Sequence, residues 1–122
     1  MGKSIAYEKA FEFAVEIIKL YKYLVAKKKE YVISKQILRS GTSIGANIKE
    51  ALQGQTKKDF IYKINISLKE ASETEYWLEL LRASNYIDEK NHELLLDKCQ
   101  ELIKILTAII KTSKQSENRG EH

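Results

Sequence analysis

The chain has 122 residues, of which 43% are hydrophobic and 31% charged, and its formal net charge at pH 7 is +4. This length suits one domain, and the apolar content is too high for a disordered chain. No segment has the roughly 18 uncharged apolar residues that a membrane span needs, and the N-terminus lacks the apolar region of a signal peptide. The single cysteine, Cys99, fits a reducing compartment, so we expect a cytoplasmic protein with no membrane partner.

Helices are the favoured secondary structure because residues that form turns are rare. Proline is absent, and glycine away from the chain ends occurs only at Gly41, Gly45 and Gly54. A β-sandwich or an α/β chain of this size needs many more turn residues. We therefore expect a few long helices.

Apolar residues spaced three and four positions apart predict a first helix over residues 5–26. The three lysines at 27–29 end this pattern and are expected to form the first loop. A second helix is expected over residues 32–53. Gly54 is interpreted as its C-terminal stop, because glycine adopts the left-handed capping conformation without steric cost.

Thr56-Lys57-Lys58-Asp59 has the form of a capping box, which predicts a third helix over residues 57–84 with Thr56 as its N-cap. A short turn and a fourth helix over residues 89–112 follow. Helices joined by short loops alternate in direction. Residues 1–113 are therefore predicted to form an all-α, antiparallel up-down-up-down four-helix bundle, and the polar residues 114–122 a disordered tail.

Two glycines, Gly41 and Gly45, fall inside the predicted second helix, where each costs about 1 kcal/mol relative to alanine. They are four positions apart and share one face of the helix, which favours close approach of a neighbouring helix. The alternative is a break or kink in the helix at this point.

The apolar surface of the predicted helices is larger than one bundle core requires. The apolar residues outside the main seams are Ile61, Leu68, Leu94, Leu96 and Ile105. Apolar faces of this kind mark subunit contacts, so we expect a homo-oligomer. The alternative is a wide apolar seam in a monomer.

Positive charge is concentrated in residues 19–39, where seven basic residues face Glu30 alone, giving a local net charge of +6 and leaving −2 for the rest of the chain. Such a block binds polyanions through their phosphates. The candidate nucleic-acid-binding residues are Lys22, Lys27, Lys28, Lys29, Lys35 and Arg39. Tyr21, Tyr23 and Tyr31 lie among them, and tyrosine rings stack on unpaired bases. The alternative is a solvated helix end and loop without a ligand.

The sequence contains no motif typical of an enzyme. It has no glycine-rich phosphate-binding loop and no nucleophile elbow. Glu89-Lys90-Asn91-His92 matches one half of a di-iron site, but no second internal histidine exists to complete such a site. Cys99 lies on the apolar seam of the fourth helix and is interpreted as a small buried hydrophobe. We therefore expect no catalytic residues, no metal and no cofactor.

Polar residues interrupt the apolar faces of the second and third predicted helices. Asn47 and Glu50 lie on the second helix, and Glu70, Glu73 and Trp77 on the third are expected to answer them across the bundle. A buried polar network fixes helix register, because each unsatisfied group costs about 1–3 kcal/mol. We interpret these residues as structural, together with the two glycines of the second helix.

Residues 40–51 read Ser-Gly-Thr-Ser-Ile-Gly-Ala-Asn-Ile-Lys-Glu-Ala, and residues 58–78 begin with Lys-Asp-Phe-Ile-Tyr-Lys and end with Glu-Thr-Glu-Tyr-Trp-Leu. These stretches resemble the central and third-helix motifs of the four-helix-bundle proteins encoded in 23S ribosomal RNA intervening sequences. The resemblance covers about residues 7–112. Many members of that family have proline where this chain has Gly45.

The resemblance implies an antiparallel four-helix bundle that assembles into a ring of five subunits. It also implies kinship with the accessory variability proteins of diversity-generating retroelements, which are basic pentamers that bind nucleic acid and a reverse transcriptase. A reverse transcriptase is therefore a candidate partner through these relatives only. The resemblance brings no established activity with it.

Residues and resemblance together predict a non-enzymatic, oligomeric helical-bundle protein. It is expected to bind RNA or single-stranded DNA weakly and without sequence specificity through the basic block. The alternative is a structural or protein-interaction scaffold that binds no nucleic acid. Salt-sensitive binding distinguishes the two hypotheses.

Overall fold

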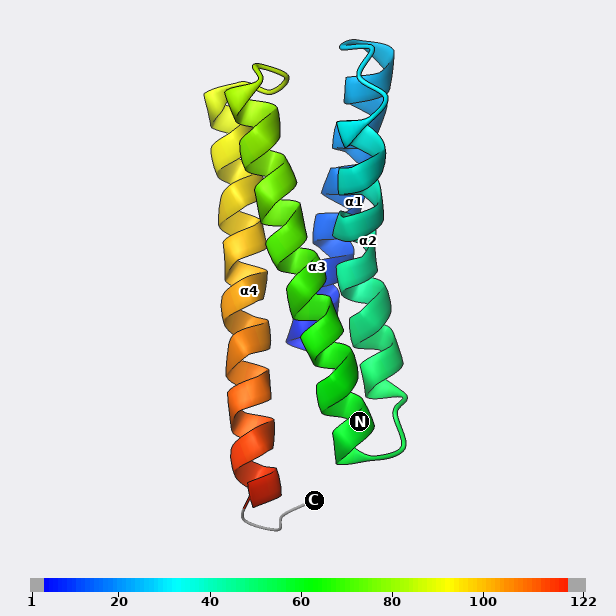
Figure 1. Cartoon of the computed structure of the whole chain (residues 1–122), viewed down its shortest axis with the longest axis vertical. Coiled ribbons are helices and arrows are strands. Elements are labelled where there is room, and N and C mark those ends of the chain that lie inside the picture. Colours follow the sequence, from blue (N-terminus) through cyan, green and yellow to red (C-terminus); the bar gives the residue numbers. More distant parts are fainter. Residues whose placement is uncertain (1–3, 119–122) are drawn as a thin grey trace.

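The computed structural model describes residues 4–118, which form four α-helices and no strand (Figure 1). The helices are α1 (Ile5–Ala26), α2 (Ile33–Leu52), α3 (Lys57–Ala83) and α4 (Glu89–Asn118). The bounds expected from the sequence for the first three helices differ from these by at most one residue. The protein is therefore all-α, as its composition indicates.

Polar side chains cap the helix N-termini, where backbone amides have no partner within the helix. Thr56 Oγ1 accepts a hydrogen bond from the amide of Asp59 at 3.0 Å, which confirms Thr56 as the N-cap of α3. At the start of α4, a carboxylate oxygen of Asp88 accepts from the amide of Asn91 at 2.8 Å. These side chains determine where each helix begins.

The ends of α2 and α3 differ from each other. After α3, Asn85 adopts a left-handed φ of 64°, and the Tyr86 amide donates to the Leu81 carbonyl at 2.9 Å. After α2, Gly54 is not left-handed, so its predicted capping role is wrong. Its amide instead donates to the Ala51 carbonyl at 3.1 Å, in a tight turn of the type that often ends helices.

The fourth helix continues past Thr112 to Asn118, so the prediction of a disordered tail is wrong for residues 114–118. Lysine, glutamine and glutamate in this segment are good helix formers, and residues 113–118 contain no glycine or proline. Its polar composition therefore does not end the helix. Residues 119–122 of the predicted tail lie outside the described residues.

The core is formed by one apolar stripe from each helix. Burying each large side chain contributes about 1.5–3 kcal/mol relative to leaving it exposed. The large side chains that are less than 2% exposed are Phe13, Ile17, Leu24, Ile37, Ile44, Ile48, Ile64, Thr74, Leu78, Leu81, Leu102 and Leu106. Cys99 is also fully buried among them, which confirms its interpretation as a core residue.

The two glycines of α2 face α1, and α2 is one uninterrupted helix. A Cβ atom added at Gly41 would lie 2.9 Å from side-chain atoms of Ile17, and one at Gly45 would lie 3.5 Å from the Cβ of Ala10. The interpretation that these glycines allow a neighbouring helix to approach closely is therefore confirmed.

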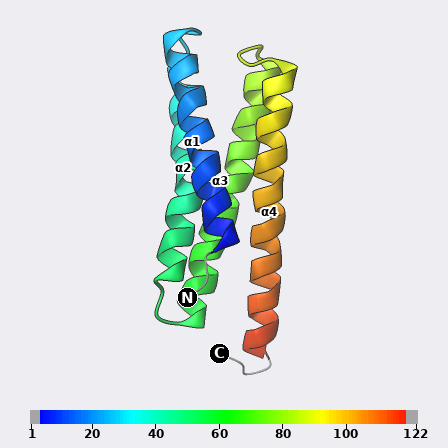
Figure 2. The ribbon, with the colours of Figure 1, turned by 180° about the vertical axis from the view of Figure 1, so that it is seen from behind.

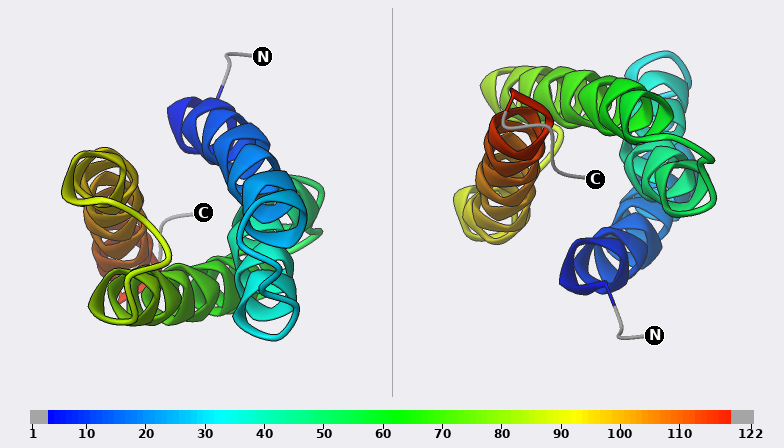
Figure 3. Two further views of the ribbon diagram at one scale, coloured as in Figure 1. Left: turned by 90° about the horizontal axis from the view of Figure 1, so that it is seen from above. Right: turned by 90° about the horizontal axis from the view of Figure 1, so that it is seen from below.

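Each helix packs mainly against the next one in the chain, whereas α1 and α4 pack against each other least. Seen along the bundle axis, the four helices form an arc that is open between α1 and α4 (Figure 3). The α1–α2 and α3–α4 loops lie at one end of the molecule and the α2–α3 loop at the other (Figures 1 and 2).

Some apolar side chains lie outside the core, although not all of those expected. Leu94 is 53% exposed, but Ile61 is only 9% exposed, so its interpretation as surplus apolar surface is wrong. Since α3 packs against both α2 and α4, a wide arc of its surface is buried. On α1, Phe11, Val15 and Ile18 are exposed at helical spacing. None of the four described helices is long and apolar enough to cross a membrane.

Candidate nucleic-acid interface

Five of the six predicted phosphate contacts surround the α1–α2 loop at one end of the molecule (Figure 1). We call them the basic surface: Lys22, Lys27, Lys28, Lys29 and Lys35. All five side chains are exposed. Among residues 4–118, none of their ammonium groups takes part in a hydrogen bond or an ion pair. The basic surface therefore presents its full charge to solvent.

The one acidic residue of this loop, Glu30, points inward and is 8% exposed. Its carboxylate accepts hydrogen bonds from the amides of Val32, Ile33 and Ser34, at 3.1, 2.9 and 2.7 Å. These amides belong to the start of α2, whose N-cap residue makes no side-chain cap of its own. Glu30 is thus the cap of α2, a role that the sequence analysis missed.

The electrostatics of Glu30 follow from this position. Burial raises the pKa of the carboxyl, but the hydrogen bonds from the amides of Ile33, Ser34 and Val32 together outweigh burial. The pKa of Glu30 is therefore lowered from its usual value. The charged form is also favoured by the positive end of the α2 dipole. A signal in the sequence was available, since an acidic residue precedes a helix start without Ser, Thr, Asp or Asn at its N-cap.

Lys29 makes the turn that brings Glu30 inward. Its φ is 54°, in the left-handed region that residues other than glycine and asparagine rarely adopt. After this turn the Glu30 amide donates to the Leu24 carbonyl at 3.0 Å, which closes the C-terminal end of α1. The same turn leaves the side chains of residues 27–29 in solvent.

Aromatic side chains accompany the basic surface. Tyr23 and Tyr31 are exposed, whereas Tyr21 is half-buried at the edge of the bundle. Two of the three tyrosines noted in the sequence therefore have rings that a ligand can reach.

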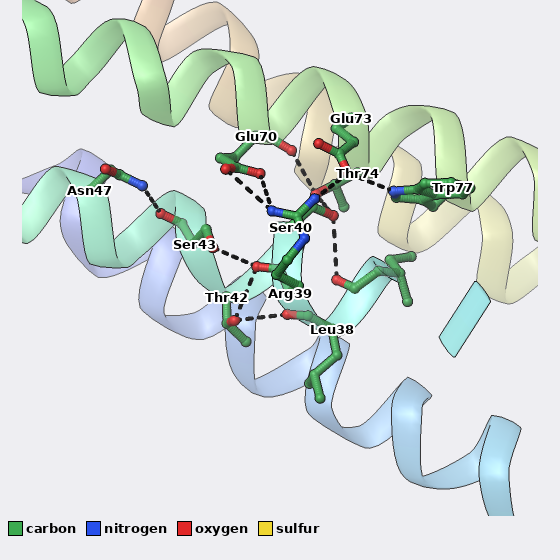
Figure 4. A network of polar contacts seen from close by, with 11 residues as sticks. Leu38, Arg39, Ser40, Thr42, Ser43, Asn47, Glu70, Glu73, Thr74 and Trp77 are labelled. Atoms are coloured by element: carbon green, nitrogen blue, oxygen red, sulfur yellow. Dashed lines mark hydrogen bonds and ion pairs between the residues drawn. The ribbon is translucent and has the colours of Figure 1, made fainter. Parts of the chain in front are cut away.

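Arg39, the sixth predicted contact, lies on α2 and is held by α3 (Figure 4). Its guanidinium forms ion pairs with Glu70, at 3.2 Å, and with Glu73. The hydrogen bond to Glu73 raises the pKa of Arg39. Arg39 therefore joins α2 to α3. Because two carboxylates already neutralise its charge, we do not include it in the basic surface.

The polar motif residues are partnered differently from the sequence-based expectation. Trp77 Nε1 donates to Glu73 at 3.1 Å, and this bond, with a smaller contribution from Arg39, lowers the pKa of Glu73 despite burial. Asn47 donates to the Ser43 carbonyl of its own helix. The expectation that Glu70, Glu73 and Trp77 contact Asn47 and Glu50 is wrong. Glu70 and Glu73 pair with Arg39 instead, and Trp77 donates to Glu73.

Glu50 forms its ion pair with Lys63 of α3 at 2.7 Å, near the α2–α3 loop. Deeper between α2 and α3, the Ser67 hydroxyl donates to the Ile44 carbonyl at 2.8 Å, and the Thr74 and Ser40 hydroxyls are 2.8 Å apart. These bonds link α2 to α3 in one register.

The single cysteine is buried in the core. The Cys99 thiol donates to the Ala71 carbonyl at 3.2 Å. Burial, with a smaller contribution from Glu75, raises the pKa of Cys99 to about 12, so the thiol stays protonated near neutral pH. Within the described residues there is no group of three or more His, Cys, Asp and Glu side chains able to hold a metal ion.

Residues 2–108 match the sequence profile of the family described as 23S rRNA-intervening sequence protein. The chain belongs to this family. A crystal structure of a protein of unknown function from the S23 ribosomal protein family of Bacteroides thetaiotaomicron has the same fold, with a TM-score of 0.87. The two sequences are 57% identical over 88% of this chain and 99% of the Bacteroides chain. No curated protein matches the chain.

Family membership confirms the resemblance drawn from residues 40–51 and 58–78, and both stretches lie inside the matched region. In the structure these stretches face one another, because α2 and α3 are the most extensively packed pair of helices. The two stretches therefore form much of the seam between α2 and α3, whereas the basic surface lies at the other end of α2 from the Glu50–Lys63 pair.

Proposed function

We propose that this member of the 23S rRNA-intervening sequence protein family is a non-enzymatic protein that binds RNA or other nucleic acid weakly and without sequence specificity. The observation that carries the proposal is the basic surface, five exposed lysines around one loop that form no ion pair with the described residues. Lysines that contact phosphates release the counterions condensed on the nucleic acid, so binding depends strongly on salt. The buried thiol and the absence of a metal cluster among residues 4–118 offer no support for an enzymatic role.

The proposal includes assembly as an up-down-up-down bundle in a ring-shaped homopentamer, which the family resemblance implies. The exposed apolar residues of α1, Phe11, Val15 and Ile18, support contact between subunits because they lie on one face of the helix. A ring repeats the basic surface five times and so multiplies weak contacts with one polyanion. A reducing compartment such as the cytoplasm suits the free Cys99.

The test is a charge reversal with a matched control. The variant Lys27→Glu, Lys28→Glu, Lys29→Glu should abolish binding of labelled RNA in a fluorescence-anisotropy titration. The control is Lys90→Glu, Lys104→Glu, Lys111→Glu, which changes the net charge equally at exposed positions of α4. Equal affinities of the two variants would contradict the assignment of the basic surface.

The second candidate function is a scaffold that binds protein partners and no nucleic acid. The exposed apolar face of α1 favours it, since apolar patches serve any protein contact. This function predicts an intact oligomer without affinity for RNA or single-stranded DNA at moderate salt. A reverse transcriptase is the partner that the wider relatives make worth testing in that case.

A further inference from the structure

The helical arc is open between α1 and α4 (Figure 3). A cleft is lined by residues of these two helices and of the loop before α4. Its volume is about 460 Å³, which lies within the range of small-ligand sites. Its lining residues come from the second half of α1 and from the start of α4 with the preceding loop. The cleft is therefore at the same end of the molecule as the basic surface (Figure 2).

The cleft is lined by three buried apolar residues and by two exposed ones, Tyr23 and Leu94. Leu20 and Leu95 are each 8% exposed and Ile87 is 5% exposed. Tyr23 of α1 is 43% exposed, and Leu94 of α4 also lines the cleft. A flat aromatic group entering here would meet an aromatic ring and aliphatic side chains.

The rim of the cleft is more available to anions than to cations. Asp88 accepts hydrogen bonds from Asn91 as the cap of α4, and Glu16 is paired with Lys19 at 3.5 Å. Lys98 lies on the rim, and its ammonium has no hydrogen bond or ion pair among the described residues. A negatively charged ligand group would therefore find an unpaired cation at this rim.

The cleft is continuous with the basic surface along α1. Lys19, Tyr23 and Lys27 are spaced four residues apart, and the amide of Lys27 donates to the Tyr23 carbonyl at 2.8 Å. Side chains four residues apart lie on the same helix face. A strand whose phosphates contact Lys27 would thus pass over the Tyr23 ring within one helical turn.

We propose that this cleft receives an unpaired base of a single-stranded nucleic acid, stacked on Tyr23, while the adjoining phosphates contact Lys27 and Lys98. The inference rests on the proposed function and narrows its ligand from nucleic acid in general to strands with unstacked bases. Bases inside a duplex are paired and stacked and cannot enter the cleft. Stacking on an aromatic ring is tolerant of sequence, as weak specificity requires.

The experiment compares single-stranded RNA with a fully paired RNA duplex, each of about 12 nucleotides. Tyr23→Ala should lower the affinity for the single strand about 5- to 150-fold and leave duplex affinity unchanged. Tyr76→Ala, at an exposed tyrosine of α3 that does not line the cleft, is the matched control and should change neither affinity. A 2-aminopurine base in the single strand reports stacking directly through quenching of its fluorescence.

A second variant removes the cation at the rim of the cleft. Lys98→Ala should also weaken single-strand binding, by more than the control Lys104→Ala at another exposed lysine of α4, and an unchanged unfolding midpoint shows that the fold is intact. If Tyr23→Ala and Lys98→Ala both bind the single strand like the native protein, the cleft is not the base site, although the proposed function stands. If the native protein binds neither RNA, both the proposed function and this inference fail.

Discussion

Two groups of cations that are neighbours in the sequence have opposite surroundings in the folded chain. Lysines 27–29 lie in the α1–α2 loop, exposed and with no ion pair in the part of the chain that the structure describes, whereas Arg39 lies against Glu70 and Glu73 of α3. Both groups contribute to the same +6 block when charge is summed along the chain. The comparison shows that local net charge identifies a binding surface only after the partners across the bundle are known.

The difference comes from where the acidic residues fall. The loop has one, Glu30, and its hydrogen bonds to the start of α2 keep its carboxylate turned inward. The α2–α3 seam places two carboxylates within reach of one guanidinium, and Trp77 holds the second of them in place. The lysines of the α1–α2 loop are therefore free to contact phosphates, whereas the charge of Arg39 is already neutralised by two carboxylates.

The largest expected effect is a change in the salt dependence of RNA binding, which we expect for variants of the loop lysines and not for a variant of Arg39. Lys27→Ala with Lys28→Ala should lower the slope of log Kd against log salt by about two, one for each phosphate that the variant no longer neutralises. Arg39→Gln should leave this slope unchanged and lower the free energy of unfolding by about 0.5–1 kcal/mol, because its ion pairs are partly exposed. A reduced slope for Arg39→Gln would place that residue on the binding surface and break the comparison.

The next effect concerns Glu30, whose buried carboxylate caps α2. Glu30→Ala leaves three amides at the start of α2 without their acceptor and should lower the free energy of unfolding by about 2 kcal/mol. Urea unfolding measures it. Glu93→Ala, at an exposed acidic residue of α4, is the control and should stay within about 0.5 kcal/mol of the native protein. Equal losses for the two variants would refute the capping role.

The sequence predicted the helices well and their polar contacts poorly, for physical reasons. Helix bounds depend on local signals, such as the Thr56 cap and the absence of proline, which can be read along the chain. The partners of Arg39 depend on the rotation and register of α2 against α3, which apolar spacing does not define to within one turn. The end of α4 was missed because polar residues without glycine or proline still form helix.

The cleft was likewise beyond sequence reasoning. Tyr23 was noted among the lysines, but Lys98 and Leu94 come from a helix more than 70 positions later. No local pattern in the sequence indicates that these residues lie together. The opening between α1 and α4 follows from how the four helices pack, since these two pack against each other least.

A smaller effect tests the close packing of α2 against α1. Gly45→Ala should stabilise the protein by up to about 1 kcal/mol, because alanine is the better helix former and the new Cβ has ordinary contact with Ala10. Gly41→Ala should destabilise it by about 1 kcal/mol, because the new Cβ would press on Ile17 at 2.9 Å. Thermal unfolding of both variants checks the sign, and stabilisation by Gly41→Ala would contradict close packing at this site.

The smallest effect is the response of stability to acid. Because the pKa of Glu30 is lower in the folded chain than the usual 4.5, its contribution is complete above pH 4.5 and is lost as the pH falls through the folded value. Glu30→Gln should therefore lose less stability than the native protein between pH 7 and pH 3. Urea unfolding at both pH values measures this difference, and identical losses would contradict the lowered pKa.

The central claim, that the exposed lysines of the α1–α2 loop bind nucleic acid, is tested most directly on the native protein. Its mass is first determined by light scattering, and single-stranded RNA is then titrated by fluorescence anisotropy at two salt concentrations. The account predicts an oligomer whose affinity falls steeply with added salt. A folded oligomer that binds no RNA even at low salt would contradict it.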